Sequence, residues 1–284
     1  MKDIKEEMKS DTIVTAGTTE LQHGKKNNRV YLMKFSENDF PGIIQKIEEL
    51  VVQNSYTKIF CKVPSWSSSA FLRNGYRMEA FIPGFFKGTE DAFFMAKYFD
   101  TKRVEPDAEK FIQFGNFIQK NQSCLQKKLI VNDFQIRKLE LSDLDKAAEI
   151  YTIVFKNYPF PVYDPNYLRK TMKSHIRYFG AWRNGKLTGV SSSEMDMENL
   201  NAEMTDFAVL PEGRGKSVAL HLLREMDKQM KKAGIRTTFT IARLNSISMN
   251  KTFLNAGYHF SGTLVNNTCI SDGIESMNVY YKTL

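Results

Sequence analysis

A glycine-bearing turn between a strand and a helix is the part of the sequence best suited to chemistry. An apolar segment over residues 207–210 runs into Pro211, a basic turn follows over residues 213–216, and apolar residues recur at helical spacing from Ser217 onward. In such a turn, several backbone N–H groups point to one spot at the positive end of a helix dipole. The segment therefore predicts a site for a phosphate or pyrophosphate group.

The turn fits neither the Walker A loop nor the dinucleotide pattern G-x-G-x-x-G. Its arrangement, Arg214-x-x-Ser217-x-Ala219, resembles the pyrophosphate loop of the GNAT acyl-CoA N-acetyltransferases, which reads Gln/Arg-x-x-Gly-x-Gly/Ala. Ser217 replaces the usual glycine, and its side chain limits how closely the backbone can approach the phosphates. The alternative interpretation is an ordinary strand-turn-helix connection with a solvated Arg and Lys.

This resemblance implies acetyl-CoA as the cosubstrate and a set of residues that bind it. Backbone N–H groups over residues 207–209 would polarise the thioester carbonyl, as an oxyanion site does. Asn245 falls roughly where the family contacts the pantetheine arm, although a helix cap or turn residue explains it equally well. The implied cofactor-binding residues are Phe207, Ala208, Val209, Arg214, Gly215, Lys216, Ser217, Val218, Ala219 and Asn245.

Acidic residues gather just before the turn, at Glu194, Asp196, Glu198, Glu203 and Asp206. Amide formation from a thioester needs a base, because a lysine-type amine has a pKa of about 10.4 in water. GNAT enzymes often carry the base on the fourth strand, where Glu203 falls, so the resemblance implies Glu203 and Asp206 as catalytic residues. In a regular strand these two side chains face opposite sides, and a bulge, usual in the family, would bring them together.

Two further roles are less defined by the sequence. Glu194 and Asp196 alternate along one strand face and could contact a cationic substrate, although acids on a strand face are more often simply solvated. The family's usual proton donor is a tyrosine four positions before a Gly-Phe/Tyr pair, and here Phe253 stands in that place. Ser248, Tyr258 or a water could protonate the leaving thiolate instead, and the sequence does not choose among them.

The composition is that of a folded protein rich enough in apolar residues to build a core. The chain has 284 residues, 42% of them hydrophobic, and a net charge of +8, which suits one large domain or two ordinary ones. The positive charge suits a phosphate-rich ligand, and the scattered Lys and Arg argue against a nucleic-acid surface. We expect no signal peptide and no membrane span.

The cysteines predict a reducing compartment. Cys61, Cys124 and Cys269 are widely spaced and odd in number, so neither a structural metal site nor a disulfide framework is expected. We therefore expect a cytoplasmic protein with free thiols and no bound metal.

The order of expected elements from residue 132 to 284 is that of a GNAT domain. The helix signals and the Asn184-Gly185 hairpin turn give a strand at 134–139, a helix at 142–155, an aromatic loop at 158–164, a helix at 167–173, strands at 187–195 and from 202, the long helix from 217, a strand at 237–241, a helix at 246–255 and two final strands. The prediction is an α/β fold with a mixed sheet flanked by helices, in which residues 132–284 are the catalytic domain. Residues 103–131 are expected to form a helical connector.

The N-terminal region repeats part of this pattern. Phe71-Leu-Arg-Asn-Gly-Tyr76 matches Phe253-Leu-Asn-Ala-Gly-Tyr258, and the distance from the glycine to a later methionine is the same in both copies. The helix of the first copy opens with Asn-Asp-Phe-Pro-Gly over residues 38–42, with no basic glycine turn before it. We interpret residues 1–102 as a degenerate GNAT-like domain that has lost its cofactor loop.

Strings along nearly the whole chain look more specifically like the beta-lysine N-acetyltransferases. They are Tyr158-Pro-Phe-Pro161, Ser192-Ser-Glu-Met-Asp196, Asn201-Ala-Glu-Met-Thr-Asp-Phe-Ala208, Thr240-Ile-Ala-Arg243, Gly262-Thr-Leu-Val-Asn-Asn-Thr268 and Glu275-Ser-Met-Asn278, with Asn74-Gly-Tyr76 and Pro83-Gly-Phe-Phe86 in the N-terminal copy. The resemblance implies acetylation of the side-chain amine of beta-lysine, whose product, N-epsilon-acetyl-beta-lysine, is an osmolyte.

Beta-lysine carries two ammonium groups and one carboxylate, which suits the charged residues of these strings. Acids such as Glu194 and Asp196 could hold the ammonium that does not react, and Arg243 could pair with the carboxylate in a bidentate way. Two other functions stay open: an N-acetyltransferase of another small amine or of a protein, and a catalytically silent acetyl-CoA sensor, suggested by Ser217 and Phe253. The sequence does not indicate the oligomeric state.

Overall fold

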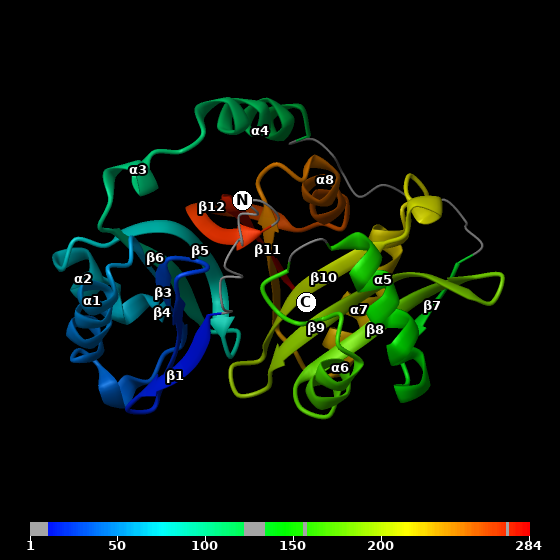
Figure 1. Ribbon diagram of the computed structural model, residues 1–284, viewed down its shortest axis with the longest axis horizontal. Helices are drawn as coiled ribbons and strands as arrows, with labels where there is room; N and C mark the ends of the chain where they lie inside the picture. The colour runs from blue at the N-terminus through cyan, green and yellow to red at the C-terminus, as the bar shows by residue number, and fades with distance from the viewer. Residues whose placement is uncertain (1–10, 122–133, 156–157, 271–272) are drawn as a thin grey trace, which may run out of the picture.

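Two mixed sheets, one from each half of the chain, organise the fold of the computed structural model (Figure 1). The structure describes residues 11–121, 134–155, 158–270 and 273–284. The sheet of the N-terminal half contains β1 (Thr12–Ala16), β2 (Thr19–Gly24), β3 (Arg29–Lys34), β4 (Lys58–Pro64), β5 (Arg77–Phe86) and β6 (Glu90–Tyr98). Its helices are α1 (Ile43–Asn54) and α2 (Ser68–Arg73), with 3-10 turns η1 (Glu37–Asp39) and η2 (Ser65–Ser67).

The C-terminal half builds a larger sheet with helices on both faces. Its strands are β7 (Gln135–Lys138), β8 (Ile176–Arg183), β9 (Lys186–Asp196), β10 (Asn201–Val209), β11 (Thr237–Arg243), β12 (His259–Ile270) and β13 (Gly273–Thr283). Its helices are α5 (Leu144–Val154), α6 (Pro165–Met172), α7 (Val218–Lys232) and α8 (Ile247–Asn255), with 3-10 turns η3 (Leu141–Asp143) and η4 (Pro211–Gly213). The elements expected from the sequence are confirmed, with ends shifted by one or two residues.

The two sheets share one strand order. The first runs β1-β2-β3-β4-β6-β5, and the second, beyond β7, runs β8-β9-β10-β11-β13-β12. In each sheet one central pair is parallel, β3 with β4 and β10 with β11. The repeat predicted from the sequence is therefore present in the fold.

The matching hexapeptides end equivalent helices, α2 and α8. Gly75 and Gly257 both have a left-handed backbone, with φ of 81° and 83°, a conformation that glycine adopts without a Cβ clash. After each glycine, a tyrosine N–H donates back to the phenylalanine carbonyl five residues earlier, at 3.2 Å in the first copy and 3.0 Å in the second. The same local hydrogen bonding explains why the same residues recur.

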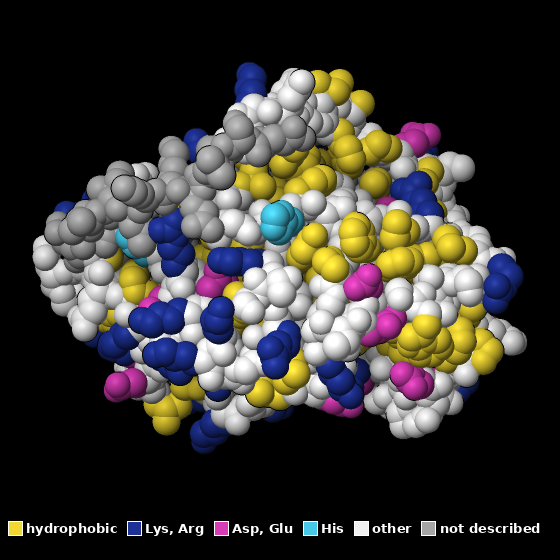
Figure 2. All heavy atoms as spheres, turned by 180° about the vertical axis from the view of Figure 1, so that it is seen from behind, with side chains coloured by type: hydrophobic (Ala, Val, Ile, Leu, Met, Phe, Trp, Pro, Cys, Tyr) yellow, Lys and Arg dark blue, Asp and Glu magenta, His cyan; other side chains and the backbone are white. Residues whose placement is uncertain are grey.

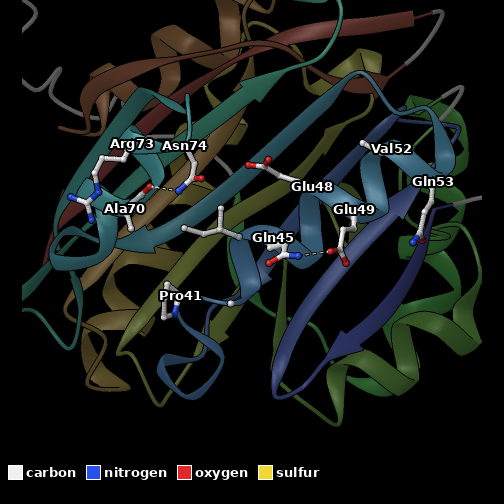
Figure 3. A pocket seen from close by; sticks show the side chains of 11 residues that line it. Pro41, Gln45, Glu48, Glu49, Val52, Gln53, Ala70, Arg73 and Asn74 are labelled. Carbon is white, nitrogen blue, oxygen red and sulfur yellow. Dashed lines mark hydrogen bonds between the residues drawn. The ribbon is translucent and has the colours of Figure 1, made fainter.

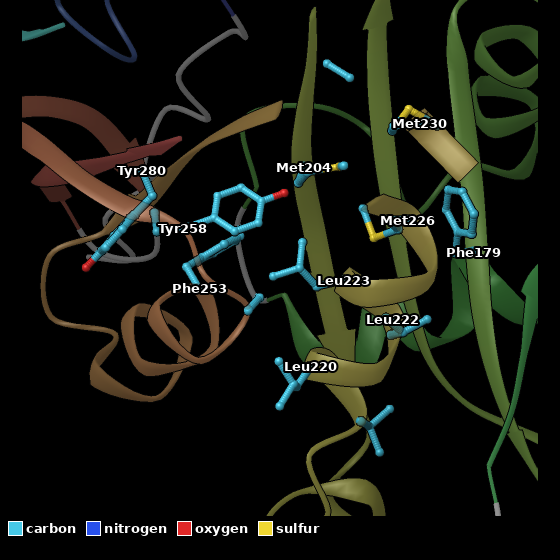
Figure 4. Packing of buried hydrophobic residues seen from close by; sticks show 14 of the residues in the cluster. Phe179, Met204, Leu220, Leu222, Leu223, Met226, Met230, Phe253, Tyr258 and Tyr280 are labelled. Atoms are coloured by element: carbon cyan, nitrogen blue, oxygen red, sulfur yellow. The ribbon is translucent and has the colours of Figure 1, made fainter. Parts of the chain in front are cut away.

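The periodic apolar face of α7 forms the centre of the C-terminal core. Leu222, Leu223, Met226 and Met230 are fully buried against the sheet and α8 (Figure 4). This spacing of three and four residues places all four side chains on one face of the helix. A second core under α5 and α6 covers the opposite face of the same sheet.

The connector between the halves is helical where the structure describes it. It consists of α3 (Thr101–Val104) and α4 (Ala108–Asn121), and α4 crosses above α8 in Figure 1. Phe114 of α4 meets Phe260 of β12 edge to face, with ring centroids 5.2 Å apart. Residues 122–131 of the predicted connector and Cys124 lie outside the described residues, while Cys61 and Cys269 are buried free thiols. The domain boundaries at residues 102 and 131 stay predictions.

The distribution of charged side chains and the character of the helices agree with the expectations from composition. Lys and Arg are spread over the face seen in Figure 2, with Asp and Glu among them. Within the described ranges, no helix is both long and apolar enough to cross a bilayer.

The two halves pack face to face through an apolar layer and a polar junction. The apolar layer joins side chains such as Phe60 and Phe94 to Phe239 and Val279. The polar junction forms at a bulge in β12, where the pairing with β13 shifts between Leu264 and Thr268. Residues 265–267 fall within this shift and have no one-to-one pairing with β13, and their carbonyls accept hydrogen bonds from the N-terminal half and the connector.

Each of these carbonyls accepts a hydrogen bond from a buried cation. Lys58 Nζ donates to Val265 at 2.7 Å, Arg103 Nε to Asn266 at 2.6 Å, and Arg29 Nη1 to Asn267 at 2.6 Å. Lys58 also forms an ion pair with Glu79 at 2.9 Å, and both side chains are almost fully buried. Removing one partner of such a pair leaves an uncompensated charge in the interior.

We expect Glu79→Ala to lower the free energy of unfolding by about 3–5 kcal/mol, because it strands the Lys58 ammonium. Glu198→Ala is the matched control, since its pair with Lys34 is exposed and such pairs contribute about 0–1 kcal/mol. Denaturant unfolding of both variants measures the difference. Equal losses in the two variants would contradict the role given to the junction.

Candidate active site

A fork between β10 and β11 opens the site. The two parallel strands pair only over residues 201–203 and 237–239 and then diverge. A cavity of about 400 Å³ lies at this fork, lined by Phe207 on one strand and by residues 240–243 on the other. Strands of the N-terminal half close its far wall, so the cavity belongs to both halves.

Glu194 and Glu203 are direct cross-strand partners on β9 and β10, and both face this cavity. Asp206 lines it as well, because β10 bulges between Thr205 and Ala208 and Asp206 has a φ of 55°. In an unbroken strand, residues 203 and 206 would face opposite sides. The bulge thus brings three carboxyl groups into one cavity.

Burial and mutual repulsion raise the pKa values of the acid pair. For Glu194, burial and then the charges of Glu203 and Asp206 raise the pKa to about 8, against the opposing effect of Lys62. For Glu203, burial raises the pKa to about 7, Lys62 lowers it, and Asp206 raises it. Around neutral pH the pair can therefore hold one shared proton and offer one carboxylate as a base.

Asp206 is held by two hydroxyl groups. Ser192 Oγ donates to it at 2.5 Å and Tyr158 Oη at 2.6 Å. Burial raises the pKa of Asp206, while these hydrogen bonds lower it. Tyr158 comes from the aromatic loop predicted after α5, so Asp206 fixes that loop against the cavity.

The predicted pyrophosphate turn leads from η4 into α7. Gly215 and Ser217 have φ values of 75° and 57°, and no side chain caps the helix. The first N–H groups of α7, from Val218 and Ala219 onward, have no carbonyl one turn earlier within the helix. Ser217 therefore takes the left-handed backbone for which the family pattern has glycine.

The side chains of the turn point outward. Arg214, Gly215, Lys216 and Ser217 are exposed, and Lys216 Nζ donates to the Glu212 carbonyl at 2.7 Å. Arg214 is thus placed to meet a phosphate that approaches from solvent.

Ahead of the turn, the three residues predicted to form the oxyanion site have different surroundings on β10. Phe207 lines the cavity, while Ala208 is buried in the core beneath α5. Val209 pairs with Gly189 of β9. The backbone of this segment follows the bulge and lies along the open side of the fork.

Three predicted contact residues are engaged elsewhere. Asp196 accepts hydrogen bonds from the backbone of the β9–β10 turn and from the side chain of Asn199. Arg243 lines the cavity but donates Nε and Nη2 to Glu275 at 2.8 and 2.6 Å. Asn245 lines a separate cavity of about 390 Å³ beside the connector. Their roles in substrate or cofactor binding stay predictions.

The structure narrows the candidates for the proton donor. Phe253 is buried and meets Phe207 edge to face, with centroids 5.7 Å apart. Tyr258 is also buried and donates to Asp227 at 2.6 Å, away from the cavity, and Ser248 is exposed on α8. Tyr158 brings a further hydroxyl group to the cavity, outside the donors predicted from the sequence.

The wall from the N-terminal half is not among the features predicted from the sequence. Arg29 and Tyr31 on β3 and Lys62 on β4 line the cavity. The available signal is alternation: both strands are apolar on one face and carry these residues on the other. Such a pattern predicts that the second face of these strands is covered. It does not predict which part of the protein covers that face.

The place equivalent to the pyrophosphate turn differs in the first copy. A pocket of about 870 Å³ lies between α1 and α2 (Figure 3), lined by Glu48 and Glu49 as well as Arg73. Pro41 and Gly42 precede α1 where the second copy has its basic turn. The absence of a cofactor loop in residues 1–102 remains our interpretation, and these carboxylates make the pocket unfavourable for phosphates.

A forked central strand pair and an α7 preceded by a basic turn define an N-acetyltransferase of the GNAT class, and residues 145–252 match the acetyltransferase (GNAT) family. A beta-lysine N(6)-acetyltransferase of Methanococcus maripaludis is 36% identical over 276 residues, 96% of this chain and 98% of that protein. The N-acetyltransferase YodP of Bacillus subtilis is 29% identical over 281 residues, 96% and 99% of the two chains. A beta-lysine N(6)-acetyltransferase of Methanosarcina mazei is 33% identical over 159 residues, 56% and 59%.

The chain belongs to the beta-lysine N(6)-acetyltransferase family. The expected fold, a GNAT-type mixed sheet preceded by a second GNAT-like half, is confirmed.

We expect Glu194 and Glu203 to titrate together, with apparent pKa values near 8 and 7. Carbon NMR of protein labelled at the glutamate carboxyl groups measures this, and the signals should vanish in a variant with both residues changed to Gln. Because the folded pKa values exceed the ordinary glutamate value of 4.5, the wild type should lose stability relative to that variant as pH rises from about 4.5 to 8. Ordinary glutamate titration at every position would refute the coupled pair.

Proposed function

We propose that this protein transfers the acetyl group of acetyl-CoA to the side-chain amine of beta-lysine, giving N-epsilon-acetyl-beta-lysine. The observation that carries the proposal is the coupled pair Glu194 and Glu203 inside a cavity that opens on the β10–β11 fork. Relatives of nearly full length that are named for the same reaction support the choice of acceptor. We further propose a cytoplasmic role for the product as a compatible solute.

The cofactor site follows from the fork and the turn. The N–H groups at the start of α7 and the Arg214 guanidinium would hold the pyrophosphate, and residues 215–219 would wrap it. The pantetheine arm would run between β10 and β11, toward Phe207 in the cavity. The acetyl carbonyl would then accept hydrogen bonds from backbone N–H groups over residues 207–209.

The acceptor amine would lie beside Glu203. Glu203 takes a proton from the ammonium, directly or through a water, and the free nitrogen attacks the carbonyl carbon of the thioester. The C–S bond then breaks, and the thiolate leaves with a proton from Tyr158 or a water, which is replaced by the proton that the attacking nitrogen loses as it becomes the amide. Asp206 holds Tyr158 in position and helps place the amine, and Glu194 keeps the second ammonium of the substrate close.

A panel of acceptors tests the proposal. Purified protein with acetyl-CoA should acetylate beta-lysine with a higher kcat/KM than lysine, ornithine or spermidine, and mass spectrometry should locate the acetyl group on the terminal nitrogen. A preference for another amine would show that the proposed acceptor is wrong, while the reaction would still be N-acetyl transfer. No transfer to any amine, with acetyl-CoA still bound, would favour the silent sensor.

We expect Glu203→Gln to lower kcat by about 10²–10⁴, the usual contribution of a general base, with little change in the acetyl-CoA KM. The loss should shrink toward pH 10, because free amine becomes abundant there. Glu198→Gln, an exposed acid in the same region, is the control and should behave like the wild type. If Asp206→Asn loses activity and Glu203→Gln does not, the two roles are exchanged.

For the cofactor turn, Arg214→Ala should raise the acetyl-CoA KM roughly tenfold or more through loss of a charge-assisted contact. The acceptor KM should change little, since Arg214 lies outside the cavity lining. Lys186→Ala removes a nearby exposed cation paired with Glu212 and serves as the control. An unchanged acetyl-CoA KM in Arg214→Ala would remove the turn from the cofactor site.

A further inference from the structure

The N-terminal half contributes a wall of mixed character to the acceptor cavity. Strands β3 and β4 pair in parallel, with Tyr31 opposite Phe60. One face of the pair packs under α1, and the other turns Arg29, Tyr31, Phe60 and Lys62 to the cavity. This half therefore brings Arg29, Lys34 and Lys62, together with Glu20, to a cavity whose acid pair comes from the C-terminal half.

Four cations line the cavity, and three of them have partners of their own. Arg29 donates to the Asn267 carbonyl and to Thr268. Lys34 pairs with Glu198 at 3.0 Å, and Arg243 with Glu275 at 2.6 Å.

Lys62 is the fourth cation, and its ammonium lies over aromatic rings. Its Nζ is 5.4 Å from the ring centroid of Tyr31 and 5.5 Å from that of Phe239. Among residues whose placement is described, no carboxylate forms an ion pair with it. Lys62 thus has no carboxylate in direct contact, although the charges of Glu203 and Glu194 act on it from the facing wall.

The surroundings of Lys62 keep it charged. Burial lowers its pKa, but Tyr31 and Glu203 outweigh this effect, and the pKa of Lys62 is raised. Arg29 lies 5.2 Å from the same Tyr31 ring, so two cations flank one ring of the wall that faces the acids. A carboxylate bound beside these two cations is attracted by both, whereas an ammonium placed there is repelled by both.

We propose that Lys62 binds the carboxylate of the acceptor, so that the N-terminal half selects amino acids over plain diamines. The inference rests on the proposed function, in which the reacting amine lies at Glu203. A substrate whose ammonium meets the acid pair and whose carboxylate meets Lys62 then matches the sign of charge on the two facing walls of the cavity. A diamine is attracted by the acids and repelled by Lys62, which is how the site would discriminate.

The test compares beta-lysine with 1,4-diaminopentane, which is the same molecule without the carboxylate. The wild type should prefer beta-lysine, and Lys62→Met should raise the KM for beta-lysine roughly tenfold or more. The KM for 1,4-diaminopentane should stay unchanged or fall. The ratio of kcat/KM values for the two acceptors cancels any effect of Lys62 on Glu203, because both acceptors use the same base.

Two further variants complete the experiment. Lys62→Arg keeps the charge and should retain most of the preference for beta-lysine. Lys34→Met removes a cavity-lining cation that already pairs with Glu198, and it should leave the ratio within about twofold of the wild type.

The outcomes separate this inference from the proposed function. If Lys62→Met lowers kcat/KM for both acceptors by the same factor, Lys62 acts on the base or on folding, and the inference is wrong. If the wild type acetylates both acceptors equally well, the inference is wrong and the acetyltransferase reaction stands. If it acetylates neither but does acetylate a different amine, the proposed substrate is wrong, and with it the inference that Lys62 binds the carboxylate of that substrate.

Discussion

The bulge in β12 is the constraint on which the arrangement of this protein depends. A strand that bulges leaves backbone carbonyls without a partner, and a buried carbonyl needs a hydrogen bond. Here Lys58, Arg103 and Arg29 supply those bonds from the other half and from the connector. A shift of one half against the other would break all three hydrogen bonds at once. The buried cations would then lie beside the apolar layer without hydrogen-bond acceptors. The cavity keeps its shape because its two walls are joined in this way.

The junction also gives the N-terminal half a place in the cavity. In the C-terminal half, the forked strands and the acid pair supply what an acyl transfer needs. The other half adds a wall that ends the cavity and carries positive charge. Buried carboxyl groups with raised pKa values are costly for folding, and Lys62 partly offsets that cost for both acids. In the proposed mechanism, catalysis and recognition would thus share one electrostatic environment drawn from both copies.

Much of this could be predicted from the sequence, because local signals were strong. The hairpin at Asn184-Gly185, the apolar face of α7 and the hexapeptide repeat each depend on residues close in the chain. The acids on β9 and β10 could also be found, since they precede a recognisable turn. The contacts between the halves could not, because no local pattern states which face of β3 and β4 meets which strand. Arg243 shows the same limit: its partner, Glu275, lies on another strand.

The central claim is that the acceptor binds between the halves, with its reacting amine at the acid pair. A crystal structure with CoA and beta-lysine bound tests it most directly. The account predicts the terminal amine within hydrogen-bond distance of Glu203 and the rest of the molecule directed toward β3 and β4. A beta-lysine molecule bound outside this cavity, with no group near residues 29–34 or 58–64, would contradict it.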